Sequence, residues 1–261
     1  MGATGTLSRI DINCDMGEGF GAYSLGHDAD IVPHVTSANI ACGFHAGDPG
    51  WMRATVSLAE RHHVRIGAHP GFPDLRGFGR RVMHATAAEI VDDLVYQAGA
   101  LTAFTGAKRL QHVKPHGALY NLAVEREEVA RAVCEAVLRL DCNLILVVLA
   151  GSPWERTARR MGLRVAREVF ADRAFDARGA LVPRAVPGAV IHDEAAVVER
   201  SLRLAVDHRV TAITGEDLEL PADTICLHSD TPGAVRLAAS LRQAFARAGV
   251  EAVPMADLVA P

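Results

Sequence analysis

The sequence has no large excess of charge of either sign and no long hydrophobic run. Its 27 Lys and Arg against 31 Asp and Glu give a formal net charge of −4, so no basic surplus indicates a nucleic-acid partner. The longest apolar run, 144–151, is far shorter than the ~20 residues that span a bilayer, so we expect no membrane partner. Hydrophobic residues make up 49% of the chain, which excludes a disordered protein.

Paired cysteine motifs and a signal-peptide pattern are missing as well. The five cysteines, at positions 14, 42, 134, 142 and 226, include no CxxC pair, and their number is odd. The N-terminal residues lack the apolar core of a secretory signal. These features are typical of a cytoplasmic protein with reduced thiols, which is the location we expect.

A regular alternation of short apolar runs and helical periodicity fills the chain. Single α/β barrels often reach ~250 residues, and we expect one domain over 1–261. The alternation predicts parallel strands joined by right-handed crossovers. The predicted strands are 9–15, 35–43, 64–70, 110–117, 144–150, 164–171 and 224–230. Helices are expected at 50–62, 86–104, 125–139, 194–208 and 233–248.

Several predicted strands carry a row of polar side chains on one face. In the first strand, residues two apart share a face, which groups Asp11, Asn13 and Asp15. The fourth and seventh strands carry similar rows: His112, Lys114 and His116, and Cys226, His228 and Asp230. Burying such groups without partners costs ~1–3 kcal/mol each. A closed barrel lets them converge on one cavity, so we favour it over an open doubly wound sheet.

Phosphate-binding loops are also absent. A G-x-G-x-x-A pattern at 17–22 follows the first predicted strand, but the carboxylates of Asp15 and Glu18 would face the phosphates of a dinucleotide. We therefore reject a dinucleotide site. No GxxxxGK[ST] motif occurs in the chain, so a standard ATP-binding loop is missing.

Three histidines lie at the ends of consecutive predicted strands. His45, His69 and His116, together with Asp15 and Asp230, are a suitable set for a divalent metal. They are equally suitable as general acids and bases. Ligands in a barrel come from different strands, so spacing along the sequence leaves both interpretations open.

The basic residues near these strand ends have two interpretations each. An inward Lys114 needs an anion, which is either a carboxylate such as Glu168 or a carboxylate or phosphoryl group of a substrate. The loop 72–81, which includes Arg76, either binds a substrate carboxylate or is a solvated surface loop. The long segment 172–192 has the length of loops that cover active sites.

Longer motifs make the chain similar to one known family. It resembles the LamB/YcsF lactam-utilisation family, and the resemblance extends from Asp11 to about Ala234. The motifs that carry it are DINCDMGEGFG, ANIACGFHAGDP, IGAHPGFPDLRGFGRR, VKPHGALYN, EVFADRAFD, LVPR and CLHSDTPGA.

The resemblance implies an irregular seven-stranded TIM-like (β/α) barrel related to the glycoside hydrolase/deacetylase barrel group. It implies a cytoplasmic protein that works with companion subunits B and C to open the lactam 5-oxo-L-proline to L-glutamate, with ATP hydrolysed to ADP and phosphate. Barrel relatives hold a metal with one Asp and two His, which correspond here to Asp15, His45 and His69.

From the inward polar faces we predict that the catalytic residues are Asp15, His45, His69 and His116. The predicted substrate-binding residues are Asn13, Asn39, Arg76, Lys114, Glu168, His228 and Asp230. Because the chain has no phosphate loop, we expect a companion protein to bind ATP. Two alternatives remain, a stand-alone metal-dependent amidase or deacetylase for another small amide, and a non-catalytic component that binds the lactam.

Overall fold

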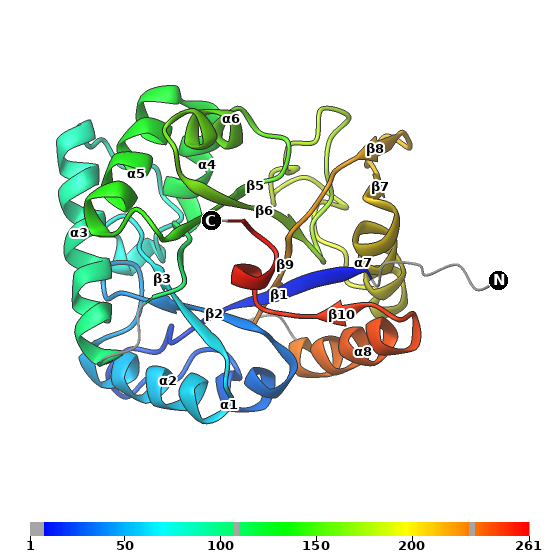
Figure 1. Cartoon of the computed structure of the whole chain (residues 1–261), viewed down its shortest axis with the longest axis horizontal. Helices are drawn as coiled ribbons and strands as arrows, with labels where there is room; N and C mark the ends of the chain where they lie inside the picture. The colour runs from blue at the N-terminus through cyan, green and yellow to red at the C-terminus, as the bar shows by residue number, and fades with distance from the viewer. Residues whose placement is uncertain (1–7, 107–109, 230–232, 261) are drawn as a thin grey trace.

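Seven parallel strands form a closed ring in the computed structural model, which describes residues 8–106, 110–229 and 233–260. The ring closes because β9 pairs with both β6 and β1 (Figure 1). Its strands are β1 (Arg9–Met16), β2 (Ser37–Ala41), β3 (Arg65–His69), β4 (His112–Val113), β5 (Ile145–Leu149), β6 (Arg164–Phe170) and β9 (Thr224–His228). The prediction of seven strands in a (β/α) barrel is confirmed.

Helices surround the ring. The expected ones are present as α2 (Pro49–Arg61), α3 (Ala87–Phe104), α5 (Glu127–Leu140), α7 (Glu194–Asp207) and α8 (Ala234–Arg247). The structure adds α1 (Asp28–Ile31), α4 (Gly117–Glu125) and α6 (Pro153–Arg160), with short 3-10 helices η1 (Val32–His34), η2 (Leu75–Gly77) and η3 (Met255–Asp257). It also adds an antiparallel hairpin of β7 (Arg209–Thr211) and β8 (Asp217–Glu219), and β10 (Glu251–Ala252), which pairs with β1. Among the described residues, no helix combines the length and apolarity that crossing a membrane requires.

Local sequence signals explain where the main helices begin. The Asp48 side chain accepts hydrogen bonds from the backbone N–H groups of Gly50 and Trp51, and Pro49 occupies the first turn of α2. Thr86 and Glu89 form a capping box at the start of α3. These caps satisfy the N–H groups that have no partner inside a helix.

The two faces of β1 differ in polarity, as the alternation predicts. Ile10, Ile12 and Met16 are fully buried on the outer side, in the apolar layer shared with the helices. Asp11 and Asn13 are equally buried but take part in hydrogen bonds with neighbouring strands. The polar row of the first strand therefore faces the barrel interior.

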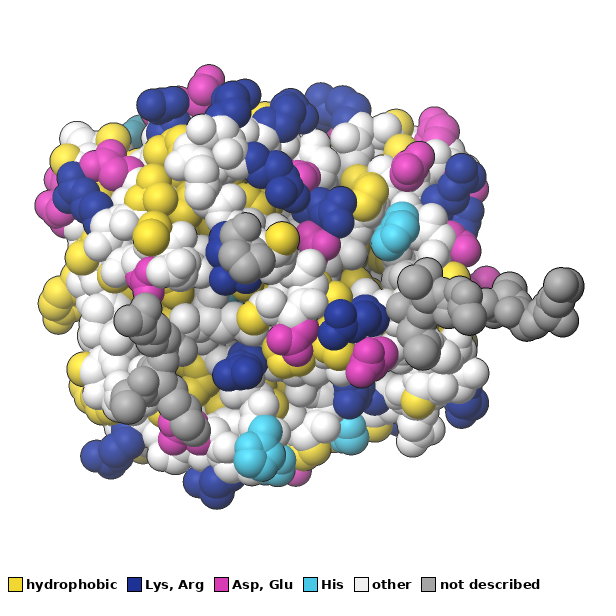
Figure 2. Space-filling view, viewed as in Figure 1, with side chains coloured by type: hydrophobic (Ala, Val, Ile, Leu, Met, Phe, Trp, Pro, Cys, Tyr) yellow, Lys and Arg dark blue, Asp and Glu magenta, His cyan; other side chains and the backbone are white. Residues whose placement is uncertain are grey.

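The C-terminal segment closes one end of the barrel. Met255 in η3 is fully buried against Ile145, Val147 and Ala166, which belong to β5 and β6. In Figure 1 this segment, drawn in red, lies across the middle of the ring of strands. The face seen in that view carries Lys and Arg side chains interspersed with Asp and Glu (Figure 2). The opposite end of the barrel, where the strands end, remains open to a cavity.

Candidate active site

The cavity at the carboxyl ends of the strands has a volume of about 710 Å³. Parallel strands deliver their last side chains to the same end of a barrel, so residues distant in sequence meet there. Its lining combines two polar groups: a histidine–carboxylate group and a set of basic residues. They are Asp15, Glu18, His69, His116 and His228, and Arg80, Lys114, Arg173, Arg178 and Arg184.

His69 and His116 approach each other at the floor of this cavity. His69 Nε2 and His116 Nδ1 are 2.9 Å apart, and His69 Nε2 is 3.3 Å from Asp15 Oδ2. The other nitrogen of each ring faces a backbone carbonyl: His69 Nδ1 is 2.6 Å from Lys114 O, and His116 Nε2 is 2.9 Å from Phe78 O.

Those carbonyls determine which ring nitrogens carry hydrogen. A carbonyl oxygen only accepts, so His69 Nδ1 and His116 Nε2 are the donors. In neutral rings, His69 Nε2 and His116 Nδ1 then present lone pairs to each other. Burial, followed by the neighbouring His69, holds the pKa of His116 well below its ordinary value, which favours the neutral ring. A proton or a cation is required between two lone pairs held at this distance.

His45 and Glu18 lie beside the rings of His69 and His116. The His45 ring stacks on His116 with centroids 3.9 Å apart, and His45 Nε2 is 3.6 Å from Glu18 Oε1. Both ring nitrogens of His45 are buried and have no hydrogen-bond partner among the described residues. Gly79, at φ +62°, lets the loop after β3 come this close, because a Cβ there would lie 2.7 Å from His45 and 2.9 Å from His116.

These residues meet the requirements of a divalent metal site. Glu18, His45, His69 and His116 each offer one donor atom within 4.8 Å of the others, and all four residues are buried. Imidazole nitrogens and a carboxylate oxygen are the donors that zinc and similar ions take. Asp15, Cys226 and His228 form a second such group. That group suits a cation less well, because the Lys114 ammonium lies 3.0 Å from Cys226 Sγ.

Lys114 forms the charged centre of the barrel interior. Its Nζ donates to Asp15 Oδ1 at 2.9 Å and lies 2.9 Å from Glu168 Oε1. Burial alone would raise the pKa of Asp15, but His69 and Lys114 outweigh it and hold that pKa well below its ordinary value. Asn39 also donates to Asp15 Oδ1, at 2.7 Å. Asp15 is therefore an anchored, ionised carboxylate whose Oδ2 faces His69.

His228 also lines the cavity, and it pairs with a second carboxylate, that of Asp172. His228 Nδ1 lies 3.2 Å from both carboxylate oxygens of Asp172, so it carries the hydrogen and donates it. Its ring stacks on Phe170, and its Nε2 is 3.3 Å from Arg184 Nη2. Asp172 thus orients His228 with Nε2 directed toward the cavity side.

The chain is similar to known proteins over nearly its whole length. The model of the LamB/YcsF family matches residues 10–260. The chain belongs to the LamB/YcsF family. It is 55% identical over 249 residues to the A subunit of 5-oxoprolinase from Syntrophobacter fumaroxidans, covering 95% of this chain and 98% of that protein. It is 53% identical over 253 residues to the A subunit of 5-oxoprolinase from Pyrococcus abyssi, covering 96% and 99%.

A solved structure gives the same fold for this LamB/YcsF chain. The lactam utilization protein from Thermus thermophilus superposes with a TM-score of 0.90 at 47% sequence identity. The match covers 94% of this chain and 99% of that one. The family expectation from the motifs is therefore confirmed.

The predicted catalytic residues of the LamB/YcsF chain meet in one place, whereas the predicted substrate-binding residues separate into layers. Asn13, Asn39 and Glu168 are fully buried beneath the cavity floor and hold Lys114 and Asp15 in position. Arg76 is exposed on η2 and does not line the cavity; Arg80 of the same loop does. Asp230 lies outside the described residues.

Several residues of the site, among them Glu18 and Arg173, were not in the predicted set. The pattern at 17–22 indicated Glu18 only as a carboxylate that excludes a dinucleotide, yet this residue belongs to the histidine group. Its signal was its position three residues after Asp15, at the end of the first strand. Arg173 belongs to the long segment 172–192, which the structure brings over the cavity, but its length alone did not single out this arginine.

Proposed function

We propose that this chain is the A subunit of an ATP-dependent 5-oxoprolinase, a cytoplasmic hydrolase that opens 5-oxo-L-proline to L-glutamate. The observation that carries the proposal is the near full-length match to proteins that bear the name of this subunit. That name supports an assembly, and we assign the companion roles to subunits B and C. The polar cavity at the open end of the barrel is the site at which the lactam binds.

The chemistry of the ring explains the need for ATP. A five-membered lactam re-forms readily because its amine and carboxyl groups stay tethered, with a high effective molarity. Phosphorylation of the amide oxygen makes the carbonyl carbon electrophilic and draws the reaction forward. The chain has no phosphate-binding loop, so a companion protein binds ATP and forms this phosphorylated lactam.

Different residues around the cavity then carry out the separate proton transfers of ring opening. Asp15 Oδ2, the oxygen not engaged by Lys114 and Asn39, orients a water molecule against the activated carbon and accepts its proton. His228, oriented by Asp172, delivers protons to the ring nitrogen. Both protons of the water end on that nitrogen as the carbon–nitrogen bond breaks. The resulting acyl phosphate releases phosphate to a second water and leaves glutamate.

We also propose that Glu18, His45, His69 and His116 hold a divalent metal. The opposed lone pairs of His69 and His116 and the unpartnered nitrogens of His45 support this assignment. Such an ion lowers the pKa of water and polarises a carbonyl oxygen. In this arrangement Asp15 remains the residue that takes the proton.

The decisive experiment measures glutamate release from 5-oxo-L-proline by the chain alone and with its B and C partners, with and without ATP. We expect glutamate only when ATP and both partners are present. ATP-independent release by the chain alone would replace the proposal with a stand-alone amidase. Lactam binding with full turnover after substitution of Asp15 and, separately, of His69 would instead indicate a non-catalytic binding component.

The metal is tested by its amount, independently of activity. We expect about one divalent ion per chain by elemental analysis after exhaustive dialysis, and a loss of at least ~10-fold in affinity in His116→Ala. His62 is an exposed histidine outside the cavity, so His62→Gln is the matched control. This variant should retain the ion. Equal metal contents in His116→Ala and wild type would refute the site.

A further inference from the structure

Arg173 is a buried cation that lines the cavity and forms no ion pair with a carboxylate of the described residues. Its residue exposure is 7%, although it forms part of the cavity wall. Its Nη2 donates to the carbonyl of Val182 at 2.7 Å, and its Nε is buried with no hydrogen-bond partner in the described ranges 8–106, 110–229 and 233–260. Within the part of the chain that the structure describes, no carboxylate forms an ion pair with it. The nearest acid in sequence, Asp172, is engaged with His228.

Its surroundings make this charge more costly to bury. Burial, followed by the nearby cation of Arg184, lowers the pKa of Arg173 to about 10; Asp172 opposes the shift without cancelling it, and Arg80 adds to it. Guanidinium groups stay charged in proteins, and a buried charge normally has a counter-charge. Lys114 shows the usual solution, because it has Asp15 and Glu168 at 2.9 Å. The carboxylate near Arg173, that of Asp172, is already paired with His228, so we assign the counter-charge of Arg173 to a ligand.

The cavity indicates the kind of anion. Cavities of ~300–1,000 Å³ take drug-sized ligands, and this one, at about 710 Å³, is large for 5-oxo-L-proline, a single small ring with one carboxylate. Arg173 and Arg184 together carry more positive charge than one carboxylate neutralises, whereas a phosphoryl group carries close to two negative charges and several acceptor oxygens. Arg184 also contacts His228, the residue that protonates the ring nitrogen.

We propose that Arg173, together with Arg184, binds the phosphoryl group of the phosphorylated lactam. This inference rests on the proposed function and names the form of the substrate that the cavity receives. The Arg173 guanidinium, which lines the cavity, donates to a phosphoryl oxygen, and Arg184 lies between that group and His228. The chain therefore recognises the activated lactam by its phosphate and discriminates against the unmodified one.

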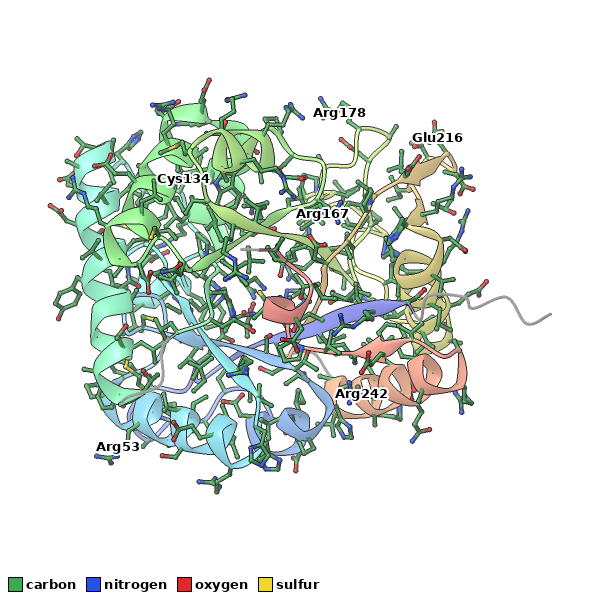
Figure 3. The ribbon with its side chains drawn as sticks, viewed as in Figure 1. Arg53, Cys134, Arg167, Arg178, Glu216 and Arg242 are labelled. Atoms are coloured by element: carbon green, nitrogen blue, oxygen red, sulfur yellow. The ribbon has the colours of Figure 1, made fainter. Side chains whose placement is uncertain are left out.

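Binding of inorganic phosphate and of 5-oxo-L-proline to the chain alone tests this directly, by calorimetric titration at constant ionic strength. We expect Arg173→Gln to weaken phosphate binding by at least ~10-fold, the loss of one charged contact. Its affinity for 5-oxo-L-proline should change by less than ~2-fold. Arg178→Gln is the matched control: Arg178 lines the same cavity, but its side chain is 86% exposed and paired with Asp176 (Figure 3). It should bind phosphate as wild type does.

Three outcomes would overturn the inference. Wild-type protein that binds no phosphate would remove the site. Equal weakening by Arg178→Gln would mean that diffuse charge, rather than a specific receptor, attracts the anion. An Arg173→Gln variant that loses the lactam while keeping phosphate would assign this arginine to the carboxylate.

Two further measurements keep the test interpretable. Arg173→Gln without ligand should unfold at the same temperature as wild type or higher, because a buried unpaired charge has been removed. If it fails to fold, Arg184→Gln, an exposed position, takes its place with the same expected loss of phosphate affinity. Glutamate release by the complex with B and C tests the proposed function separately, since phosphate binding to the chain alone does not require turnover.

Discussion

The inward faces of β1 and β5 lie in the same barrel and are buried to the same extent, yet their side chains differ completely. β1 presents Asp11, Asn13 and Asp15, whereas β5 presents Ile145 and Val147. The β1 row is hydrogen-bonded to β2, β6 and β9 and to Lys114, which directly follows β4, so each polar group has a partner. The β5 row packs against Met255 and forms no such network. A buried strand face therefore need not be apolar. It can carry polar side chains when each of them has a hydrogen-bond partner.

The largest expected effect comes from removing the cation that the polar row shares. Lys114→Met leaves the carboxylates of Asp15 and Glu168 buried without a counter-charge, and we expect a loss of ~3–5 kcal/mol in unfolding free energy. Chemical denaturation measures it. The double variant Lys114→Met/Glu168→Gln should recover part of the loss, and a single variant as stable as wild type would contradict the prediction.

Asp11 gives the polar row a dependence on pH. Burial raises its pKa from 3.8 to about 6, although hydroxyls of Ser37, Thr224 and Thr36 oppose the rise. The folded state thus binds this proton more tightly than the unfolded chain, so the contribution to stability is present at low pH. It declines as the pH rises from about 4 through 6, by up to about 3 kcal/mol.

The variant Asp11→Asn isolates that contribution, because all other groups titrate in both proteins. Relative to wild type, it should become more stable by up to about 3 kcal/mol between pH 4 and pH 7.5, measured by denaturation at each pH. A difference between the two proteins that stays constant over this range would show that Asp11 does not titrate there.

Asp15 links the polar row to turnover. Asp15→Asn keeps the shape of the side chain and its place beside Asn39, and we expect the rate of glutamate release to fall at least ~100-fold, as removal of a general base typically does. The assay uses the complex with B, C and ATP, and a circular dichroism spectrum checks the fold. Wild-type turnover by this variant would show that another group takes the proton.

The smallest effect is expected on the apolar side. Ile145→Val removes one methylene group from the packing against Met255, at a cost of ~0.5–1.5 kcal/mol in stability. Turnover per folded molecule should equal that of wild type. A clear loss of turnover would mean that β5 supports the site more directly than its packing indicates.

The barrel could be predicted from the sequence because the strands are short and several of them alternate clearly between polar and apolar residues. Asp11, Asn13 and Asp15 already indicated the inward face of β1, which the hydrogen bonds confirm. The helix α4 was not predicted because most of its residues are apolar and buried, which hides the helical period. The helix α6 has only eight residues, too few to show one.

The sequence predicted which histidines meet at the site, but not how their ring nitrogens are oriented or which charges are paired. His45, His69 and His116 were expected to meet, and they do. Which ring nitrogen carries hydrogen depends on two carbonyls, of Lys114 and Phe78, whose directions no side-chain pattern encodes. That no described carboxylate forms an ion pair with Arg173 likewise depends on the fold, because pairing depends on every group packed around a charge.

The pairing of β1 with β9 has a consequence for folding on the ribosome. These strands are neighbours in the ring but roughly 200 residues apart in the chain. At a synthesis rate of ~5–20 residues per second, β9 is made roughly 10–40 s after β1. Until then the edge of β1 that pairs with β9 has no partner strand. One face of this unpaired strand carries the row of carboxyl and amide side chains. The same polar row that later surrounds Lys114 makes the unpaired strand poorly suited to aggregation while the nascent chain is incomplete.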